Sequence, residues 1–177
     1  MGGPNAFELE MLAAINNVRA ERGLVPVQMD MPLMMAARFY SQTLSNLGFN
    51  LAHNVGPYGG SRPTAESFGA RMTWTGGNGH SGGWAVQTIL NRWMNSPGHR
   101  DFILAPAHRY IGFGSQLGGP HGVFHYLFLS DRYSIPPGSE DDNGDDNGYD
   151  NGYNGGDGEA NNNTRLPYVY EEDDLTY

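Results

Sequence analysis

A histidine in a strongly patterned eight-residue segment is the first candidate for chemistry in this chain. His99 lies in the segment Trp93-Met94-Asn95-Ser96-Pro97-Gly98-His99-Arg100. Proline disfavours helical backbone at the residue before it and glycine allows a sharp reversal, so the segment predicts the end of one helix and the start of another. A helix N-terminus favours the neutral imidazole, which can bind a metal or accept a hydrogen bond. The alternative is structural, with His99 bonding a backbone carbonyl that fixes the turn.

The segments around His99 predict helices first and a pair of strands afterwards. Asn5 and Asp30 are N-cap residues in sequence, and Gly23 and Gly48 are the matching helix ends. The strand at 122–130 is apolar on both faces, which is typical of a sheet covered by helices on both sides. The predicted helices are 6–22, 30–48, a weaker one at 64–71, and 84–94; the predicted strands are 109–117 and 122–130, joined by a hairpin turn at 118–121.

The eight-residue segment resembles a signature of the bacterial branch of the CAP superfamily, which comprises the cysteine-rich secretory, antigen 5 and pathogenesis-related 1 proteins. Three other segments resemble the family in the right order: 12–24 its opening helix, 34–38 its second helix, and 110–114 its first late strand. The resemblance covers about residues 6 to 131. It implies an α+β fold, a three-layer α-β-α sandwich of the CAP type, in a bacterial-type SCP domain. Eukaryotic relatives usually carry disulfides, whereas this chain has no cysteine.

The resemblance also implies a groove with two histidines, which hold a divalent metal in several relatives. His53 matches the first histidine and His99 the second. The two glutamates that accompany them in the family are missing, because Gly77 falls on the first and Ser96 lies near the second. The residues expected to line a groove for zinc or a small ligand are therefore His53, His99, Asn78 and Ser96.

Two further side chains between these histidines could complete a metal site. His80 lies in the glycine-rich run 76–83, which is interpreted as a loop forming the groove wall, and it is either a third metal ligand or an exposed loop histidine. Glu66 is the only acidic residue between His53 and His99, and its setting predicts a solvent-exposed helical face. Hydrolysis by a metal-bound water needs a general base within reach. We therefore expect a non-enzymatic protein, with weak metal-dependent hydrolysis as an alternative.

The charge of the chain is divided unequally between a body and a tail. Residues 1–138 hold nine arginines and seven carboxylates, formally +2, whereas 139–177 hold one arginine and twelve carboxylates, formally −11. We divide the chain accordingly into a CAP domain at 1–138, an acidic Asn/Gly-rich linker at 139–164 and a C-terminal docking segment at 165–177. The acidic tail argues against nucleic-acid binding. No apolar run reaches membrane-spanning length.

The linker has a degenerate Asn-Gly repeat that cannot bury enough apolar surface to fold alone. Its dense oxygen ligands could hold calcium, although their spacing departs from the helix-loop-helix calcium pattern. Asn162 begins a glycosylation sequon, Asn162-Asn163-Thr164. The linker is thus interpreted as a tether, with calcium binding as the alternative.

The docking segment alternates apolar and aromatic residues in the manner of a strand. Such a segment can add to a sheet edge in its own molecule or, as we expect here, in a neighbour. Repeated head-to-tail addition makes a filament. The residues expected to mediate self-association are Leu166, Tyr168, Val169 and Tyr170.

Two classes of function remain open at this point. The first is a binding module whose groove takes a metal, a lipid, a peptide or another small ligand. The second is a structural subunit of an extracellular filament or assembly. The resemblance implies an extracellular or cell-surface location, although the first residues of the given chain do not have the pattern of a signal peptide.

Overall fold

The computed structural model describes residues 3–48, 53–73 and 76–139. The docking segment with Leu166, Tyr168, Val169 and Tyr170 lies outside the described residues. So do the sequon at Asn162 and the acidic residues considered as an alternative calcium site. Within the described ranges, no helix has both the length and the hydropathy needed to cross a bilayer.

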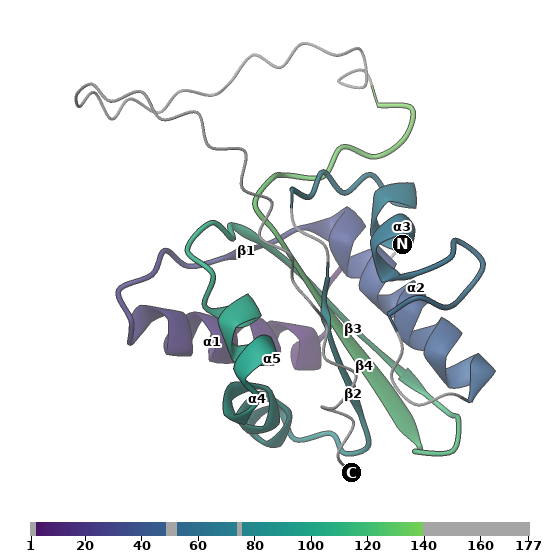
Figure 1. Ribbon diagram of the computed structural model, residues 1–177, viewed down its shortest axis with the longest axis horizontal. Coiled ribbons are helices and arrows are strands. Elements are labelled where there is room, and N and C mark those ends of the chain that lie inside the picture. The colour runs from purple at the N-terminus through teal and green to yellow at the C-terminus, as the bar shows by residue number, and fades with distance from the viewer. Residues whose placement is uncertain (1–2, 49–52, 74–75, 140–177) are drawn as a thin grey trace.

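A four-stranded sheet lies between two layers of helices (Figure 1). The strand order is β1-β3-β4-β2, with β1 parallel to β3 and the other neighbours antiparallel. Helices α1, α4 and α5 cover one face, and α2 and α3 cover the other. The elements are α1 (Ala6–Ala20), β1 (Gln28–Met29), α2 (Met31–Leu47), α3 (Ser61–Ser67), β2 (Asn78–Ser81), α4 (Val86–Asn95), α5 (Pro97–Ile103), β3 (Tyr110–Leu117) and β4 (Val123–Ser130). This is the three-layer α-β-α sandwich that was expected.

Strand β4 divides its side chains between two hydrophobic cores, because successive residues of a strand point to opposite faces. All eight of its residues are buried. Leu127 and Leu129 belong to the core under α1, α4 and α5, and Tyr126 and Phe128 to the core under α2. The prediction that both faces of this strand are covered is confirmed.

Helix α2 packs against β3 at a distance that only glycine permits. A Cβ atom added to Gly112 would overlap the backbone of Leu33. A Cβ atom added to Gly114 would lie 2.6 Å from the carbonyl carbon of Ala37 and still closer to the amide nitrogen of Arg38. The Ser41 hydroxyl donates a hydrogen bond to the Gly114 carbonyl at 3.0 Å, which confirms how near the two backbones are. The close approach leaves α2 lying directly on the sheet.

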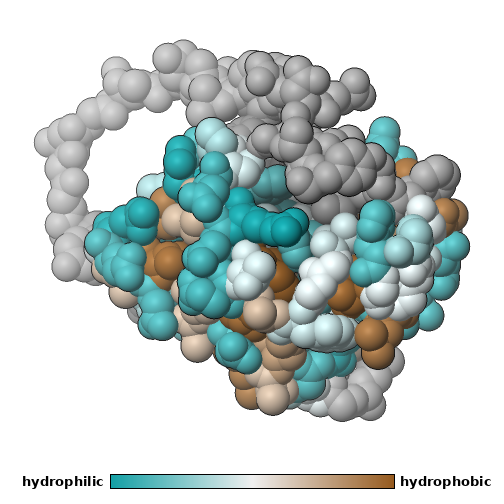
Figure 2. All heavy atoms as spheres, turned by 90° about the horizontal axis from the view of Figure 1, so that it is seen from below, coloured by the Kyte–Doolittle hydropathy of each residue, from teal (hydrophilic) through white to brown (hydrophobic). Residues whose placement is uncertain are grey.

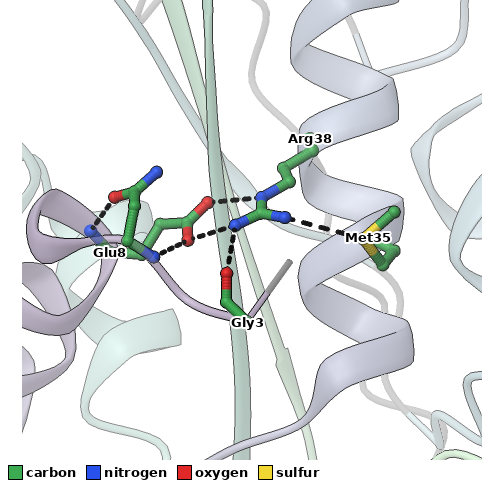
Figure 3. Close-up of polar contacts among 5 residues, drawn as sticks. Gly3, Glu8, Met35 and Arg38 are labelled. Carbon is green, nitrogen blue, oxygen red and sulfur yellow. Dashed lines mark hydrogen bonds and ion pairs between the residues drawn. The ribbon is translucent and has the colours of Figure 1, made fainter. Parts of the chain in front are cut away.

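A partly buried ion pair connects the two helical layers (Figure 3). Glu8 completes a capping box with Asn5 at the start of α1, and its side chain is only 1 % exposed. Arg38 of α2 donates to both carboxylate oxygens of Glu8 at 2.6 Å and to the carbonyl of Gly3 at 3.1 Å. Because α1 and α2 cover opposite faces of the sheet, this pair ties one layer to the other.

A fully buried arginine holds irregular segments of the chain in place. Arg19, which has no exposed surface, donates hydrogen bonds to the carbonyl oxygens of Val25, Ile103, Ala105 and His108 at 2.8–3.1 Å. Burial, followed by the nearby charge of Arg109, lowers the pKa of Arg19. The guanidinium therefore satisfies carbonyl groups at the end of α5 and in the irregular segments that precede β1 and β3.

Several predicted element bounds need correction. Helix α1 ends at Ala20 rather than near 22, α3 occupies Ser61–Ser67 rather than 64–71, and α4 begins at Val86, so that Trp84 precedes it and is 47 % exposed. Gly98 lies inside α5 with no positive φ, so the reversal there does not depend on glycine. The turn is instead made at Ser96, whose extended backbone separates the two helices.

The glycine-rich run 76–83 contains a strand and is not a loop throughout. Residues Asn78 to Ser81 form β2, which pairs with β4 over four residues. The intrinsic strand propensity of this glycine-rich segment is low, so β2 is stabilised by its pairing with β4 instead. The indole N–H of Trp93 donates to the carbonyl of Gly79 at 2.9 Å and covers the other side of β2.

Candidate functional site

Two histidines from different helical layers lie near each other at the β2 side of the sheet. His53 follows α2, and His99 lies in the first turn of α5, on the opposite face of the sheet. The electrostatic effect of His99 nevertheless contributes to lowering the pKa of His53. Tyr126, which bonds His53, lies against the backbone of Gly77, and the adjacent Asn78 bonds the carbonyl of His99. We call His53, Asn78, Ser96, His99 and Tyr126 the paired-histidine site.

His53 is held by a tyrosine that the sequence analysis did not identify. Its Nδ1 lies 2.5 Å from the hydroxyl of Tyr126 on β4, and the two rings meet edge to face. Burial, and then His99, lowers the pKa of His53 to about 4. The imidazole is therefore neutral near pH 7, which is the form that binds metals. The only advance signal was that Tyr126 lies on a buried face, where a hydroxyl needs a hydrogen-bond partner.

The same tyrosine explains why no acidic residue occupies position 77. A Cβ atom at Gly77 would lie 2.5 Å from Cε1 of Tyr126 and would also overlap the carbonyl oxygen of Leu127. A glutamate cannot be placed there while the Tyr126 ring stays where it is. Tyr126 thus supplies a neutral hydroxyl to His53 where the family pattern implied a carboxylate.

His99 is positioned by the two polar residues that were predicted to line a groove. Its Nδ1 lies 2.9 Å from the hydroxyl of Ser96, which precedes α5. The side-chain amide of Asn78, itself buried, donates to the carbonyl oxygen of His99 at 3.1 Å. Both contacts fix the first turn of α5, and with it the imidazole, against β2.

His80 lies inside the fold, and the alternative of an exposed loop histidine is wrong. It is 7 % exposed, sits opposite His125 in the β2–β4 ladder, and stacks on that ring at a centroid distance of 5.9 Å. Burial, followed by the charges of His125 and Arg92, lowers the pKa of His80 to about 4. It therefore stays neutral near pH 7.

Both ring nitrogens of His125 have partners. Its Nε2 lies 2.8 Å from the carbonyl oxygen of Gly83, and its Nδ1 lies 2.7 Å from the hydroxyl of Ser115. A carbonyl oxygen can only accept, so Nε2 carries the proton and Nδ1 accepts from Ser115. Burial lowers the pKa of His125. His125 is thus a packed and bonded core histidine.

Glu66 lies on α3 and faces solvent, as its sequence setting predicted. Its carboxylate pairs with Arg62 one helical turn earlier, at 2.6 Å, and both side chains are more than one third exposed. Across residues 3–48, 53–73 and 76–139, no cluster of three histidine, cysteine or acidic side chains has the geometry of a metal site. The paired-histidine site therefore offers two imidazoles and neutral hydroxyl groups in the described part of the chain.

The buried histidines predict a loss of stability in mild acid. Burial holds the pKa of both His80 and His108 at about 4, against 6.5 for an exposed imidazole. The unfolded chain takes up these protons first, so stability is complete above about pH 6.5 and falls as the pH drops towards 4. Each group contributes at most about 3 kcal/mol over this range. We expect the melting temperature to fall steadily between pH 7 and pH 4.5.

Two variants separate this effect from general acid sensitivity. His108→Gln should flatten the decline, whereas His121→Gln, at an exposed position of the hairpin turn, should leave it unchanged. A melting temperature that stays constant from pH 7 to pH 5 would show that these imidazoles remain accessible to protons in the folded state.

A four-stranded sheet between two helical layers, in the order β1-β3-β4-β2, defines a class of small α-β-α sandwich domains. The CAP family model, described as the cysteine-rich secretory protein family, matches residues 12–130, and the chain belongs to this family. It is 33 % identical over 110 residues to the uncharacterized protein YkwD of Bacillus subtilis, a match that covers 62 % of this chain and 42 % of that protein.

Solved structures share the fold at low sequence identity. An extracellular SCP-domain protein from Bacillus anthracis aligns with a TM-score of 0.60 and 16 % identity, over 73 % of this chain and 45 % of that one. An outer surface protein from Borrelia burgdorferi aligns with a TM-score of 0.58 and 19 % identity, over 75 % of this chain and all of that one. The chain thus spans less than half the length of YkwD and of the B. anthracis protein.

Proposed function

We propose that this chain is a non-enzymatic CAP binding module, in which His53 and His99 hold a ligand through their imidazoles. The observation that carries the proposal is a chain of contacts between the two layers: Tyr126 bonds His53 and lies against the backbone of Gly77, and the adjacent Asn78 bonds the carbonyl of His99. A fold gains no obvious stability from bringing two imidazoles together, so a shared ligand is a physical reason for the arrangement. By analogy with the B. anthracis extracellular protein, we place the chain outside the cell or on its surface.

The chemistry of the site favours a divalent metal held weakly, or a small polar ligand. Neutral imidazoles are good ligands for zinc, but zinc sites in proteins normally have three or four protein ligands. The hydroxyl of Tyr126 beside His53 acts as an outer partner that orients the ring. Two imidazoles without a carboxylate fill only two coordination positions of a metal. Water or a bound small ligand would have to occupy the remaining positions.

The same residues argue against hydrolysis. A general base must lie within hydrogen-bond reach of the attacking water. Gly77 cannot carry a carboxylate beside Tyr126, Ser96 is bonded to His99, and Glu66 is paired with Arg62. Weak metal-dependent hydrolysis remains the less favoured alternative, because neutral His80, stacked in the sheet, would have to supply the base.

Zinc titration by calorimetry, with histidine resonances followed by NMR, tests the binding proposal. We expect weak binding to the wild type that perturbs His53 and His99 and is abolished by His53→Ala or His99→Ala. Tyr126→Phe keeps the ring and removes the hydroxyl, and it should weaken binding about tenfold, the lower end of the range for an outer-shell partner. Metal-dependent ester hydrolysis should stay at the level of zinc alone.

The control variants are His121→Ala and Tyr133→Phe, both at exposed positions away from the site. Each should bind zinc as the wild type does. Zinc affinity that is equal in wild type and in the double variant His53→Ala/His99→Ala would overturn the proposal. Tight zinc binding would instead mean that a third side chain binds the metal. That side chain would be a histidine or an acidic residue to which we have assigned other contacts.

A further inference from the structure

Three arginines from distant parts of the sequence meet at the end of β4. The amide of Arg109 donates to the carbonyl oxygen of Ser130 at 2.8 Å. The hydroxyl of Ser130 lies 2.7 Å from the carbonyl oxygen of Arg132 and 3.4 Å from that of Arg71. These contacts bring the backbones of the three arginines to one end of the sheet, opposite the hairpin turn at 118–121 (Figure 1). We call Arg71, Arg109 and Arg132 the arginine cluster.

The charges of the arginine cluster are exposed and only partly balanced. Arg71 has no ion-pair partner in the described part of the chain. Arg132 is 63 % exposed, and its guanidinium lies 3.9 Å from the carboxylate of Asp131, too far for a short ion pair. That carboxylate accepts hydrogen bonds from the amide and the hydroxyl of Thr73 instead. Three guanidinium groups and one carboxylate leave this end of the sheet with a formal charge of +2.

Arg109 keeps donors for a ligand although it also bonds to its own chain. Its Nη1 donates to the carbonyl oxygens of Pro106 and His108 at 2.5 and 2.9 Å. Both bonds use the same nitrogen, which leaves the N–H groups of Nη2 and Nε for other acceptors. A planar guanidinium matches the paired oxygens of a carboxylate or a phosphate. The arginine cluster therefore favours an anionic ligand with oxygen acceptors.

An exposed aromatic pair adjoins the arginine cluster. Tyr133 directly follows Arg132, is 57 % exposed, and meets Tyr110 edge to face at a ring-centroid distance of 5.5 Å. Tyr110 lies opposite Ser130 in the β3–β4 ladder. On the face seen in Figure 2, hydrophobic residues form only several small patches among hydrophilic ones. Tyr133 thus presents an aromatic side chain next to the positive charge of the cluster.

We propose that the arginine cluster and the ring of Tyr133 bind an acidic polysaccharide, with carboxylates on the guanidinium groups and a sugar ring on the tyrosine. A positive cluster raises the local concentration of anions. One face of a sugar ring carries C–H groups and can pack on an aromatic side chain. Such a polymer agrees with the location outside the cell proposed above, by analogy with the extracellular protein of B. anthracis. The polysaccharide binds independently of any ligand at the paired-histidine site.

The acidic tail limits the distance over which this attraction acts. The full chain has a formal charge of −9, although residues 1–138 are formally +2. A polyanion therefore gains no attraction from the net charge and is held by close contacts, since charges are screened beyond about 8 Å at physiological salt. Packing on Tyr133 adds affinity that does not depend on net charge. A polymer that offers charge alone should consequently bind poorly.

A comparison of polymers tests the proposed partner, with binding to the full chain measured by biolayer interferometry at physiological salt. Polygalacturonate consists of sugar rings that carry carboxylates. We expect it to bind about tenfold more tightly than polyglutamate, which has carboxylates without sugar rings, or dextran, which has sugar rings without charge. Binding of a single-stranded oligonucleotide or of anionic phospholipid vesicles that equals the binding of polygalacturonate would overturn the proposal.

Charge variants test the proposed position of the site. Arg71→Gln with Arg132→Gln should weaken the binding of polygalacturonate about tenfold, because charge-assisted hydrogen bonds are lost. Arg92→Gln with Arg100→Gln, on α4 and α5, changes the net charge equally and should leave the affinity unchanged. Both double variants should keep the melting temperature of the wild type. Equal loss of affinity in the two double variants would mean that only net charge matters, which contradicts a site at the arginine cluster.

A tyrosine variant tests the contact with the sugar ring. Tyr133→Ala should weaken the binding of polygalacturonate and leave that of polyglutamate unchanged. Tyr58→Ala is the matched control, because Tyr58 is 47 % exposed and also rests on an aromatic ring, that of Phe39. The double variant His53→Ala/His99→Ala should bind polygalacturonate as the wild type does, so this proposal and the zinc proposal can fail separately. Unchanged polygalacturonate affinity in Tyr133→Ala would refute the ring contact and with it the choice of a polysaccharide.

Discussion

Replacing Gly114 with alanine is expected to lower the free energy of unfolding by about 3 kcal/mol or more, because a methyl group at this position has no space. The added Cβ would meet the backbone of Ala37 and Arg38 in α2. Backbone atoms of a helix cannot rotate away as a flexible side chain can, so α2 must move off the sheet. Such a shift disturbs Tyr40 in the same helix, which meets Tyr126 edge to face at a ring-centroid distance of 4.6 Å. Urea unfolding followed by circular dichroism measures the loss.

Gly98 provides the matched control for that substitution. It lies inside α5 with an ordinary backbone conformation, and nothing lies within 4 Å of an added Cβ. Gly98→Ala should therefore raise stability by up to about 1 kcal/mol, the helix-propensity difference between the two residues. If both alanine variants unfold at the same urea concentration, α2 can withdraw from β3 without cost and the close packing is unimportant.

Truncating Trp93 to alanine should cost roughly 3–5 kcal/mol, the usual range for a large aromatic residue removed from a core. Trp93 is 2 % exposed and meets Phe113 edge to face at 6.3 Å. The substitution also leaves the carbonyl of Gly79 without its indole donor. Because Gly79 lies in β2 beside His80, we expect the histidine ring signals at this edge to broaden in NMR spectra.

Two further variants resolve the contributions of Trp93. Trp93→Phe retains most of the packing and removes the hydrogen bond, so a loss of about 1–3 kcal/mol is expected from the unsatisfied carbonyl. Trp84→Ala, at a half-exposed position, should cost clearly less than Trp93→Ala. A loss below about 1 kcal/mol for Trp93→Ala would mean that the indole is not part of the core.

The elements that were predicted correctly depend on local signals. Asn5 and Asp30 accept hydrogen bonds from the first turns of α1 and α2, as their N-cap positions indicated. Gly48 ends α2 with a φ of 63°, a left-handed conformation that favours glycine. The apolar residues on both faces of β4 likewise predicted that both faces of the sheet are covered. Each of these signals acts within a few residues, and tertiary packing agrees with it.

The elements that were missed depend on partners far away in sequence. Strand β1 has two residues and exists because β3 lies beside it. Strand β2 contains Gly79 between polar residues, and its pairing with β4 outweighs its low strand propensity. The expected pairing of His53 with His99 came from family resemblance, since no local pattern predicts contact between two layers. The absence of a side chain at Gly77 is explained by the Tyr126 ring beside it, and the position of this ring is known only from the three-dimensional structure.

Arg19 has a consequence for how the chain tolerates its chemical surroundings. Its guanidinium joins α1 to carbonyl groups 84, 86 and 89 residues further along the chain, a span comparable to that closed by a long-range disulfide. A covalent link of that kind breaks in a reducing compartment, whereas hydrogen bonds to carbonyl oxygens do not respond to redox potential. The chain has no cysteine, so its melting temperature should be the same with and without dithiothreitol. Production in a reducing cytosol should therefore yield the folded domain without an oxidative folding step.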